Sequence, residues 1–297
     1  MNERILVAID GSRPSRAGLD WSVERVRNSG GQLTLVNVVD DTLAGFSRDV
    51  ESRVARRVMN SLDTERARIE REFPKLHVTT QLAYGSVWRT LRDLSAHYDL
   101  LVIGTHKNGI LKGTFLGSLG IRIAATAACS VAIIPQDAPS GRSVVVGVDE
   151  TAESWTACEF AALQAHDADS ELIIVCAGYV ANPLFEDLVP PVLPAKERAR
   201  IVARASERVL ERFPTLSVQT RVMDGPPDQA LLDTARDAGL LVVGHHKRSK
   251  IAQFFERSVA QDVLIGMSTP VIVVHHSMGA NLEPADSEPE IGAQRHE

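Results

Sequence analysis

The sequence predicts an α/β protein made of two tandem copies of one domain, each an open, mostly parallel sheet of five strands covered by helices. Three observations support this prediction. The chain of 297 residues has the length of two ordinary domains, its second half repeats its first, and short apolar runs alternate with segments of helical periodicity.

The two halves repeat one pattern at an almost constant spacing. Arg4–Asp10 returns as Ser143–Asp149, and 149 minus 10 gives an offset of 139. Leu100–Gly104 returns as Leu240–Gly244 at an offset of 140, so one residue is inserted between these points. Similarity at a fixed period over about half of a chain indicates a duplication, and two copies make a pair of domains rather than a solenoid.

A polar stretch with Pro and Gly, Gln136–Arg142, separates the copies as a linker would. We therefore expect one domain over residues 1–138 and a second over residues 142–276. Residues 277–297 are polar and lack apolar periodicity, which predicts a disordered tail. The Pro-rich segment Tyr179–Pro194 is expected to form an irregular loop.

Strands are expected where apolar residues, many of them Val and Ile, run without alternation, because strands of a parallel sheet are buried on both faces. In the first copy these runs are Ile5–Ile9, Leu33–Val39, Val78–Ala83, Leu100–Ile103 and Val131–Ile134. In the second copy they are Val144–Val148, Leu172–Ala177, Val218–Val222, Leu240–Val243 and Val271–Val274.

Helices are expected between the strands, where apolar residues recur on one stripe. Leu19, Val23 and Val26 mark one such helix, and a longer stripe runs from Val54 to Phe73. We expect the element order βαββαβαβ in each copy, with right-handed crossovers that place helices on both faces of the sheet. An open sheet of this kind binds ligands beyond the carboxyl ends of its strands.

The composition bounds the class of protein. Hydrophobic residues make up 44% and charged residues 24%, and no apolar run approaches the roughly 18 residues of a membrane span. Cys129, Cys158 and Cys176 lack metal-ligand spacing, and the apolar segment at the amino terminus is too short for a secretory signal. We therefore expect reduced, buried thiols and a cytoplasmic location. A net charge of -6 disfavours nucleic acid as a partner.

The glycine-rich segment after the fourth strand of the first copy is the part of the chain that best suits ligand chemistry. Its glycines include Gly104, Gly109, Gly113 and Gly117, and Ser118 opens a helical segment. Free backbone N–H groups at a helix start, beside glycines that allow close approach, suit a phosphate group. The alternative is that these glycines only permit tight turns.

These segments together resemble the universal stress protein family, over about residues 3–275. The resemblance is carried by an opening strand that ends in Val7–Ser12, a second strand that ends in Val36–Asp40, and a Gly-x-x-Gly loop followed nine residues later by Gly-Ser/Thr. The loop is matched in part. Gly104, Gly117 and Ser118 fit the motif and Lys107 stands at its second glycine, whereas the second copy keeps Gly244 and Ser258 but has Lys247 and Arg257 at the other two glycine positions.

The resemblance implies Rossmann-like domains of the adenine nucleotide alpha hydrolase-like fold, with ATP bound in the first copy only, alone or with Mg²⁺. By resemblance, Ala8, Asp10 and Val38 would line the adenine and ribose pocket. Gly104, His106 and Lys107 would follow the phosphates on one side, with Gly117, Ser118 and Leu119 on the other.

The resemblance also implies how the copies assemble. Val131–Ile134 and Val271–Val274 are apolar strands at the sheet edges, which would aggregate if left bare. In family members such terminal strands pair antiparallel, so we expect an intramolecular pseudo-dimer about a pseudo-twofold axis. Homodimerisation of the whole chain stays open, and the protein partners are not identified.

Several of these residues have a structural alternative. Asp10 could cap the first helix together with Ser12, Val38 could belong to the core, and Lys107 could be a solvated side chain. In the second copy Arg257 is expected to occlude an anion site, and Glu150 places a second carboxylate where a polyphosphate would lie.

Two histidine pairs raise the question of a metal site. His275 and His276 are adjacent on or just past a strand, so their side chains would point to opposite faces. His245-His246 lies in the loop after the preceding strand, where a phosphate or solvent contact suits it better. We therefore expect no metal.

Three classes of function follow from the sequence. The first is a stress-response regulatory protein that binds ATP in the first copy and changes the surface it presents to partners. The second is a structural or interaction module that binds no nucleotide. The third is a slow ATPase or nucleotidyl transferase. We expect the first class, with no catalytic residue and at most very weak ATP hydrolysis, because the sequence offers no Walker loop, Ser-His-Asp arrangement or paired carboxylates.

Overall fold

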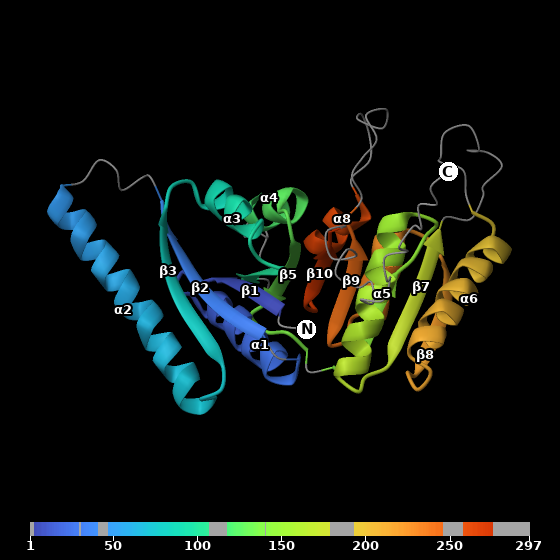
Figure 1. Cartoon of the computed structure of the whole chain (residues 1–297). Coiled ribbons are helices and arrows are strands. Elements are labelled where there is room, and N and C mark those ends of the chain that lie inside the picture. Colours follow the sequence, from blue (N-terminus) through green and yellow to red (C-terminus); the bar gives the residue numbers. More distant parts are fainter. Residues whose placement is uncertain are drawn as a thin grey trace, which may run out of the picture.

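The two copies share one continuous sheet in the computed structural model. The structure describes residues 3–29, 31–40, 47–106, 118–139, 141–178, 193–245 and 258–275. Ten strands lie in the order β3-β2-β1-β4-β5-β10-β9-β6-β7-β8, so each copy contributes five neighbouring strands (Figure 1). All strand pairs within a copy are parallel. The predicted α/β class with mostly parallel open sheets is confirmed.

In the first copy strands and helices alternate without exception. The elements are β1 (Glu3–Ala8), α1 (Arg13–Ser29), β2 (Gly31–Val39), α2 (Arg48–Glu72), β3 (His77–Tyr84), α3 (Val87–Ser95), β4 (Leu100–Thr105), α4 (Ser118–Thr126) and β5 (Ser130–Pro135). The predicted order βαββαβαβ was therefore wrong by one helix. Helix α2 separates β2 from β3, because parallel neighbours need a crossover between them.

The second copy repeats this arrangement. Its elements are β6 (Val144–Gly147), α5 (Ala152–Asp167), β7 (Leu172–Gly178), α6 (Ala195–Arg212), β8 (Val218–Asp224), α7 (Pro227–Thr234), β9 (Leu240–Gly244), α8 (Val259–Gly266) and β10 (Val271–Val274). The ten predicted strands are all present, and none of their ends moves by more than two residues. The predicted tail over residues 277–297 and most of the predicted Pro-rich loop lie outside the described residues.

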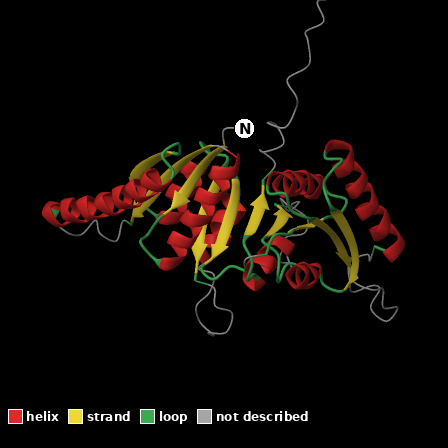
Figure 2. Cartoon of the chain, turned by 90° about the horizontal axis from the view of Figure 1, so that it is seen from below, coloured by secondary structure: helices red, strands yellow, loops and turns green. Residues whose placement is uncertain are grey.

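Helices cover both faces of the sheet. Alternate residues of a strand point to opposite faces, so Val7 of β1 packs in one apolar cluster and Leu6 packs in the other. The first cluster lies under α1, α2, α5 and α6, and the second lies under α3, α4, α7 and α8. Figure 2 shows the helices seen from below, layered against the strands. Among the described residues, no helix is long and apolar enough to cross a membrane.

The copies are joined where β5 meets β10. These strands pair antiparallel, with Ile272 opposite Ala132 and both side chains fully buried. On the same junction Arg25 of α1 donates to the Gln164 side chain of α5 and lies 5.7 Å from the ring of Phe160. Arg25 and Gln164 are equivalent positions in the repeat, so this contact lies at the pseudo-twofold axis. The antiparallel pairing of the terminal strands is confirmed.

The junction is not symmetric on its other face. His275, buried just past β10, donates its backbone N–H to Ser130 Oγ at 3.2 Å, and its Nε2 lies 2.9 Å from the carbonyl oxygen of Ala124 on α4. At the equivalent positions the repeat has Pro270 for Ser130 and Pro135 for His275. Because proline has no N–H, the mirror-image backbone bond cannot form. The backbone hydrogen bond of the second copy to Ser130 therefore has no symmetric counterpart.

The three cysteines are buried and reduced, as predicted. Burial raises the pKa of the Cys129 and Cys158 thiols to about 12 and that of Cys176 to about 11. A thiol with such a pKa carries almost no thiolate at neutral pH and is a poor nucleophile. These side chains fill the core.

Candidate functional site

The strand order reverses at β1 in the first copy. Strand β1 lies between β2 and β4, and the helices that follow β1 and β4 cover opposite faces of the sheet. A crevice opens at the carboxyl ends of two such strands, where ligands bind in open α/β sheets. The predicted residues Ala8, Asp10, Gly104 and His106 end or follow β1 and β4, so the fold brings them to this edge.

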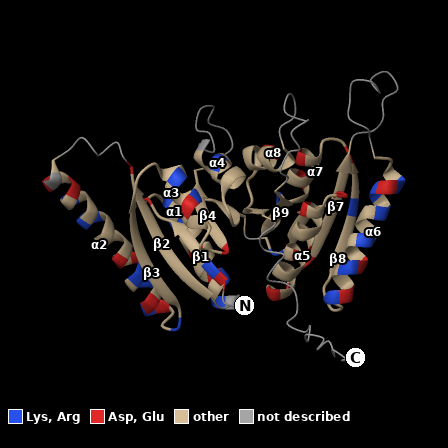
Figure 3. Ribbon diagram, turned by 45° about the horizontal axis from the view of Figure 1, so that its top comes forward, with Lys and Arg blue, Asp and Glu red and all other residues tan. Residues whose placement is uncertain are grey.

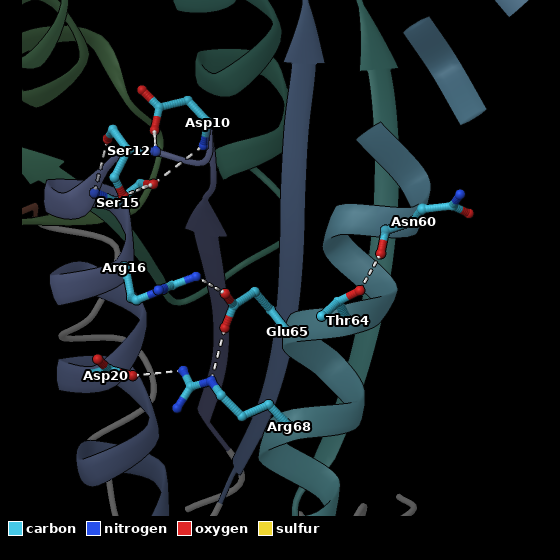
Figure 4. Close-up of polar contacts among 9 residues, drawn as sticks. All are labelled: Asp10, Ser12, Ser15, Arg16, Asp20, Asn60, Thr64, Glu65 and Arg68. Atoms are coloured by element: carbon cyan, nitrogen blue, oxygen red, sulfur yellow. Dashed lines mark hydrogen bonds and ion pairs between the residues drawn. The ribbon is translucent and has the colours of Figure 1, made fainter. Parts of the chain in front are cut away.

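Asp10 is the best-defined polar residue at this edge (Figure 4). It is exposed, and its Oδ1 accepts the backbone N–H of Ser12 at 2.9 Å. Ser12 Oγ accepts the N–H of Ser15 at 3.3 Å, so Ser12 caps α1 and Asp10 supports the turn before it. Partial burial opposes ionisation of Asp10, but hydrogen bonds from Ser12 and Ser15 outweigh it and hold its pKa below the ordinary value. The edge thus presents a fixed carboxylate.

Asn37 positions the strand end and was missed from the sequence. Its Nδ2 donates to the carbonyl oxygen of Ile9 at 2.6 Å, and the Ile9 N–H donates to Val36 O at 2.8 Å. Together these bonds hold the residue that precedes Asp10. The signal available in the sequence was a single amide inside an apolar run; the second copy has Cys176 at that position.

Gly104 is required by packing alone. A Cβ on Gly104 would lie 1.9 Å from the carbonyl oxygen of Pro14, because the start of α1 runs directly over β4. The second copy repeats this approach, since a Cβ on Gly244 would lie 2.6 Å from Glu153 O. A glycine here therefore needs no ligand to explain it.

The other predicted residues divide into three groups. Ala8, Val38 and Leu119 are partly buried and pack against the core cluster under α3 and α4, so each contributes to the core as well as to the edge. His106 is exposed. Ser118 begins α4, whereas Lys107 and Gly117 lie outside the described residues, together with Lys247 and Arg257 of the second copy.

The equivalent edge of the second copy is built differently. Asp149 Oδ1 accepts both the backbone N–H and the hydroxyl of Thr151, at 2.8 and 2.5 Å, so this oxygen is already engaged. At the position of Ala8 stands Gly147, and a Cβ there would lie 2.9 Å from Leu231 Cδ1. Leu231 therefore leaves no room for a side chain at this position.

A buried arginine is a further difference between the two edges. Arg198 of α6 is 2% exposed; its Nη2 lies 2.5 Å from Asp224 Oδ1 and its Nη1 donates to Gly178 O. Among the described residues its Nε has no hydrogen-bond partner. The first copy has Val58 at this position. Sequence reasoning missed Arg198, although a charge on the apolar stripe of a helix was the signal.

An ion-pair chain anchors α2 to α1 below Asp10 (Figure 4). Arg16 Nη2 lies 2.6 Å from Glu65 Oε1, and Arg68 bridges Glu65 and Asp20 at 2.8 and 2.7 Å. Arg16, Glu65 and Arg68 border an open groove of 790 Å³. In the repeat Trp155 and Ala205 replace Arg16 and Glu65. Because the opposite charges of these ion pairs neutralise one another, we assign the groove a structural role.

The Glu65 contacts predict a specific loss of stability in acid. Burial of Glu65 opposes its ionisation, but hydrogen bonds from Arg68 and Arg16 outweigh it and lower its pKa below the usual 4.5. A carboxyl with a lowered folded pKa stabilises the fold fully above its unfolded pKa and loses this contribution as the pH falls through the folded value. Glu65→Gln should lower the free energy of unfolding at pH 7 by about 1–3 kcal/mol. Below pH ~4.5 the free energy of unfolding should fall less steeply with pH in this variant than in wild type.

Urea denaturation of wild type and Glu65→Gln at a series of pH values checks this prediction, with Asp49→Asn on the exposed start of α2 as control. Parallel pH curves for wild type and Glu65→Gln would contradict it.

The histidines do not gather into a metal site in the described part of the chain. His245 stacks on His275 with ring centroids 4.2 Å apart. No group of three or more His, Cys, Asp or Glu side chains that could hold a metal occurs among the described residues. His246 and His276 lie outside them.

Comparisons with known proteins agree with this fold. The profile of the Universal stress protein family matches residues 1–135 and again residues 141–275. A universal stress protein of Mycolicibacterium smegmatis is 27% identical over 91% of this chain and 96% of its own length, and the protein Rv2005c of Mycobacterium tuberculosis is 27% identical over 92% and 97%.

Solved structures give the same result. A universal stress protein from Archaeoglobus fulgidus superposes with a TM-score of 0.66 at 18% identity, over 91% of this chain and 97% of that one. A protein from Pseudomonas aeruginosa superposes with a TM-score of 0.65 at 20% identity, over 92% and 93%. With both halves matched and the fold shared, this chain belongs to the universal stress protein family as a tandem of two family domains.

Proposed function

We propose that the first copy binds one adenine nucleotide at the carboxyl ends of β1, β2 and β4, that the second copy binds none, and that the chain is a nucleotide-responsive regulatory protein of the cytoplasm. The observation that carries the proposal is Asp10, an exposed carboxylate held at the point where the strand order reverses. Membership of the universal stress protein family supports it.

The geometry of Asp10 suits a ribose. A carboxylate accepts hydrogen bonds from hydroxyl groups, and Asp10 is exposed, with its Oδ1 held by the backbone N–H of Ser12. Partly buried Ala8 and Val38 lie at the ends of the two adjacent strands and offer an apolar wall to a base. The nucleotide would then lie along the edge toward α4, whose N-terminus suits a phosphate.

The second copy is unfavourable for the same ligand. Thr151 donates two hydrogen bonds to Asp149 Oδ1, and Leu231 takes the space beside Gly147. Glu150 would repel a polyphosphate. These differences support binding by one copy.

Paired alanine substitutions test the proposal. Asp10→Ala should weaken binding of ATP by at least about tenfold, because charge-assisted hydrogen bonds contribute roughly 1.5–3 kcal/mol. Asp149→Ala removes the equivalent carboxylate and should leave the affinity within about twofold of wild type. Calorimetric titration of the full chain with ATP, with and without Mg²⁺, measures both. Equal losses in the two variants, or no loss in Asp10→Ala, would contradict the assignment.

We further propose that the bound nucleotide is not turned over at enzymatic rates. Asp10 is the carboxylate assigned to the ribose, and its lowered pKa makes it a weak general base. Phosphate release from ATP should stay far below about 1 per second.

A second candidate is an interaction module that binds no nucleotide. The packing that accounts for Gly104 without a ligand favours it. Titration of wild type separates the candidates, since an interaction module gives no heat of binding with ATP.

A further inference from the structure

An aromatic and basic cluster lies on α3 and α4. Three guanidinium groups surround the partly exposed ring of Trp88: Arg122 at 4.1 Å, Arg92 at 5.2 Å and Arg89 at 5.4 Å from its centroid. Arg92 is paired with Asp93 at 2.6 Å. Three like charges around one ring repel each other, so an acidic counterpart would stabilise this arrangement.

The repeat carries the opposite charge at the same place. At the positions of Trp88 and Arg122 the second copy has Asp228 and Asp262, and at those of Arg89 and Arg92 it has Gln229 and Leu232. Helices α3 and α4 together contain three arginines and one aspartate, whereas α7 and α8 contain three aspartates and no Lys or Arg. Arg92 is paired with Asp93 in the first patch, and Asp233 is paired at 2.8 Å with Arg236, just past α7, in the second. The two halves of one chain thus display complementary patches.

The acidic patch also exposes apolar side chains. Val259 is 40% exposed and Ile265 is 41% exposed, both on α8. Exposed Val and Ile beside carboxylates make a surface that can bury the Trp88 ring and pair with its arginines.

Both patches lie over the same face of the sheet. Helices α3, α4, α7 and α8 all pack on the second core cluster, and Figure 3 shows them along one side of the molecule, with blue on α3 and α4 and red on α7. A twofold axis perpendicular to the pseudo-twofold axis would place the basic patch of one chain on the acidic patch of another, and would do so twice. Such a contact is closed and self-complementary, whereas the alternative pairing of like patches is repulsive.

We propose that this face is a dimer interface, at which the cluster of Trp88, Arg89, Arg92 and Arg122 of one chain docks on Asp228, Asp233, Val259 and Ile265 of a second copy. The partner is a second copy because the chain itself supplies the matching surface, and formation of two identical contacts doubles the buried area. Neither patch includes Asp10, so dimerisation can be measured without nucleotide, and its failure is distinguishable from failure of nucleotide binding.

Reciprocal charge reversal tests the interface in the full chain. Arg89→Glu/Arg122→Glu makes both patches acidic, and Asp228→Arg/Asp233→Arg removes two carboxylates and makes the second patch basic. Each variant alone should raise the dimer dissociation constant by about 100-fold or more, because like charges then meet at both contacts. An equimolar mixture of the two variants should restore a dimer, since every contact again joins opposite charges. Arg53→Glu/Arg56→Glu, on exposed α2, serves as the matched control and should leave the dimer unchanged.

Sedimentation equilibrium measures the dissociation constants, and melting temperatures establish that the variants are folded. A wild-type chain that is monomeric at about 100 µM, a value weaker than most specific interfaces, would overturn the proposal. So would reversed variants that dimerise like wild type, or a mixture that stays monomeric. Binding of a single-stranded oligonucleotide that quenches Trp88 fluorescence in a monomeric chain would assign the patch to nucleic acid instead.

Discussion

Gly104→Ala should destabilise the chain by about 3 kcal/mol or more, the largest effect expected from a single methyl group in this protein. The added Cβ would lie 1.9 Å from Pro14 O and 2.6 Å from Ser15 N, and all of these are backbone contacts that cannot rotate away. The start of α1 would have to lift from β4. Chemical denaturation followed by circular dichroism measures the loss.

Gly11→Ala is the matched control for this substitution. Gly11 has a φ of 83° but nothing within 4 Å of its Cβ position, so its replacement should cost only about 1 kcal/mol. If Gly104→Ala is no more destabilising than Gly11→Ala, the close approach of α1 to β4 is wrong. Loss of nucleotide binding in Gly104→Ala would accordingly be no proof of a phosphate contact, because the site itself would be displaced.

Ile272→Ala should cost about 2–5 kcal/mol and should weaken both copies together. Ile272 is fully buried opposite Ala132 at the centre of the β5–β10 pairing, and its cluster contains side chains from both halves. Since the copies share one sheet, we expect a single unfolding transition that shifts as a whole.

Val222→Ala provides the comparison at the sheet's edge. Val222 of β8 is 39% exposed, and its truncation should cost less than about 1 kcal/mol. Two separate transitions in calorimetry, with only one shifted by Ile272→Ala, would show that the copies unfold independently and that the joint contributes little.

Much of the fold could be predicted because the strands are buried on both faces. Strand β5, for example, is buried at all six positions and appears in the sequence as an uninterrupted apolar run. The apolar stripe from Val54 to Phe73 predicted helix α2, but the predicted element order omitted this helix. The pairing of β5 with β10, which joins the sheets of the two copies, was expected only from the resemblance to the family. The sequence alone does not indicate it, because an edge strand and a central strand have the same apolar composition.

The site was predicted less completely, for a physical reason. The sequence indicates Asp10, because a carboxylate at the end of the first strand precedes a helix. It does not indicate Asn37 and Arg198, because their roles depend on which carbonyl oxygens the fold brings within reach, Ile9 O for one and Gly178 O for the other. The ring of arginines around Trp88 likewise joins α3 to α4, some thirty residues apart, and no local pattern shows it.

We propose that the two copies of one domain have become unequal, so that one keeps a ligand site and the other does not. The number of nucleotides bound per wild-type chain tests this most directly, and native mass spectrometry across a titration with ATP counts them. The account predicts saturation at one nucleotide per chain, lost in Asp10→Ala and kept in Asp149→Ala. Two nucleotides per chain would contradict the inequality of the copies, and none would contradict the site itself.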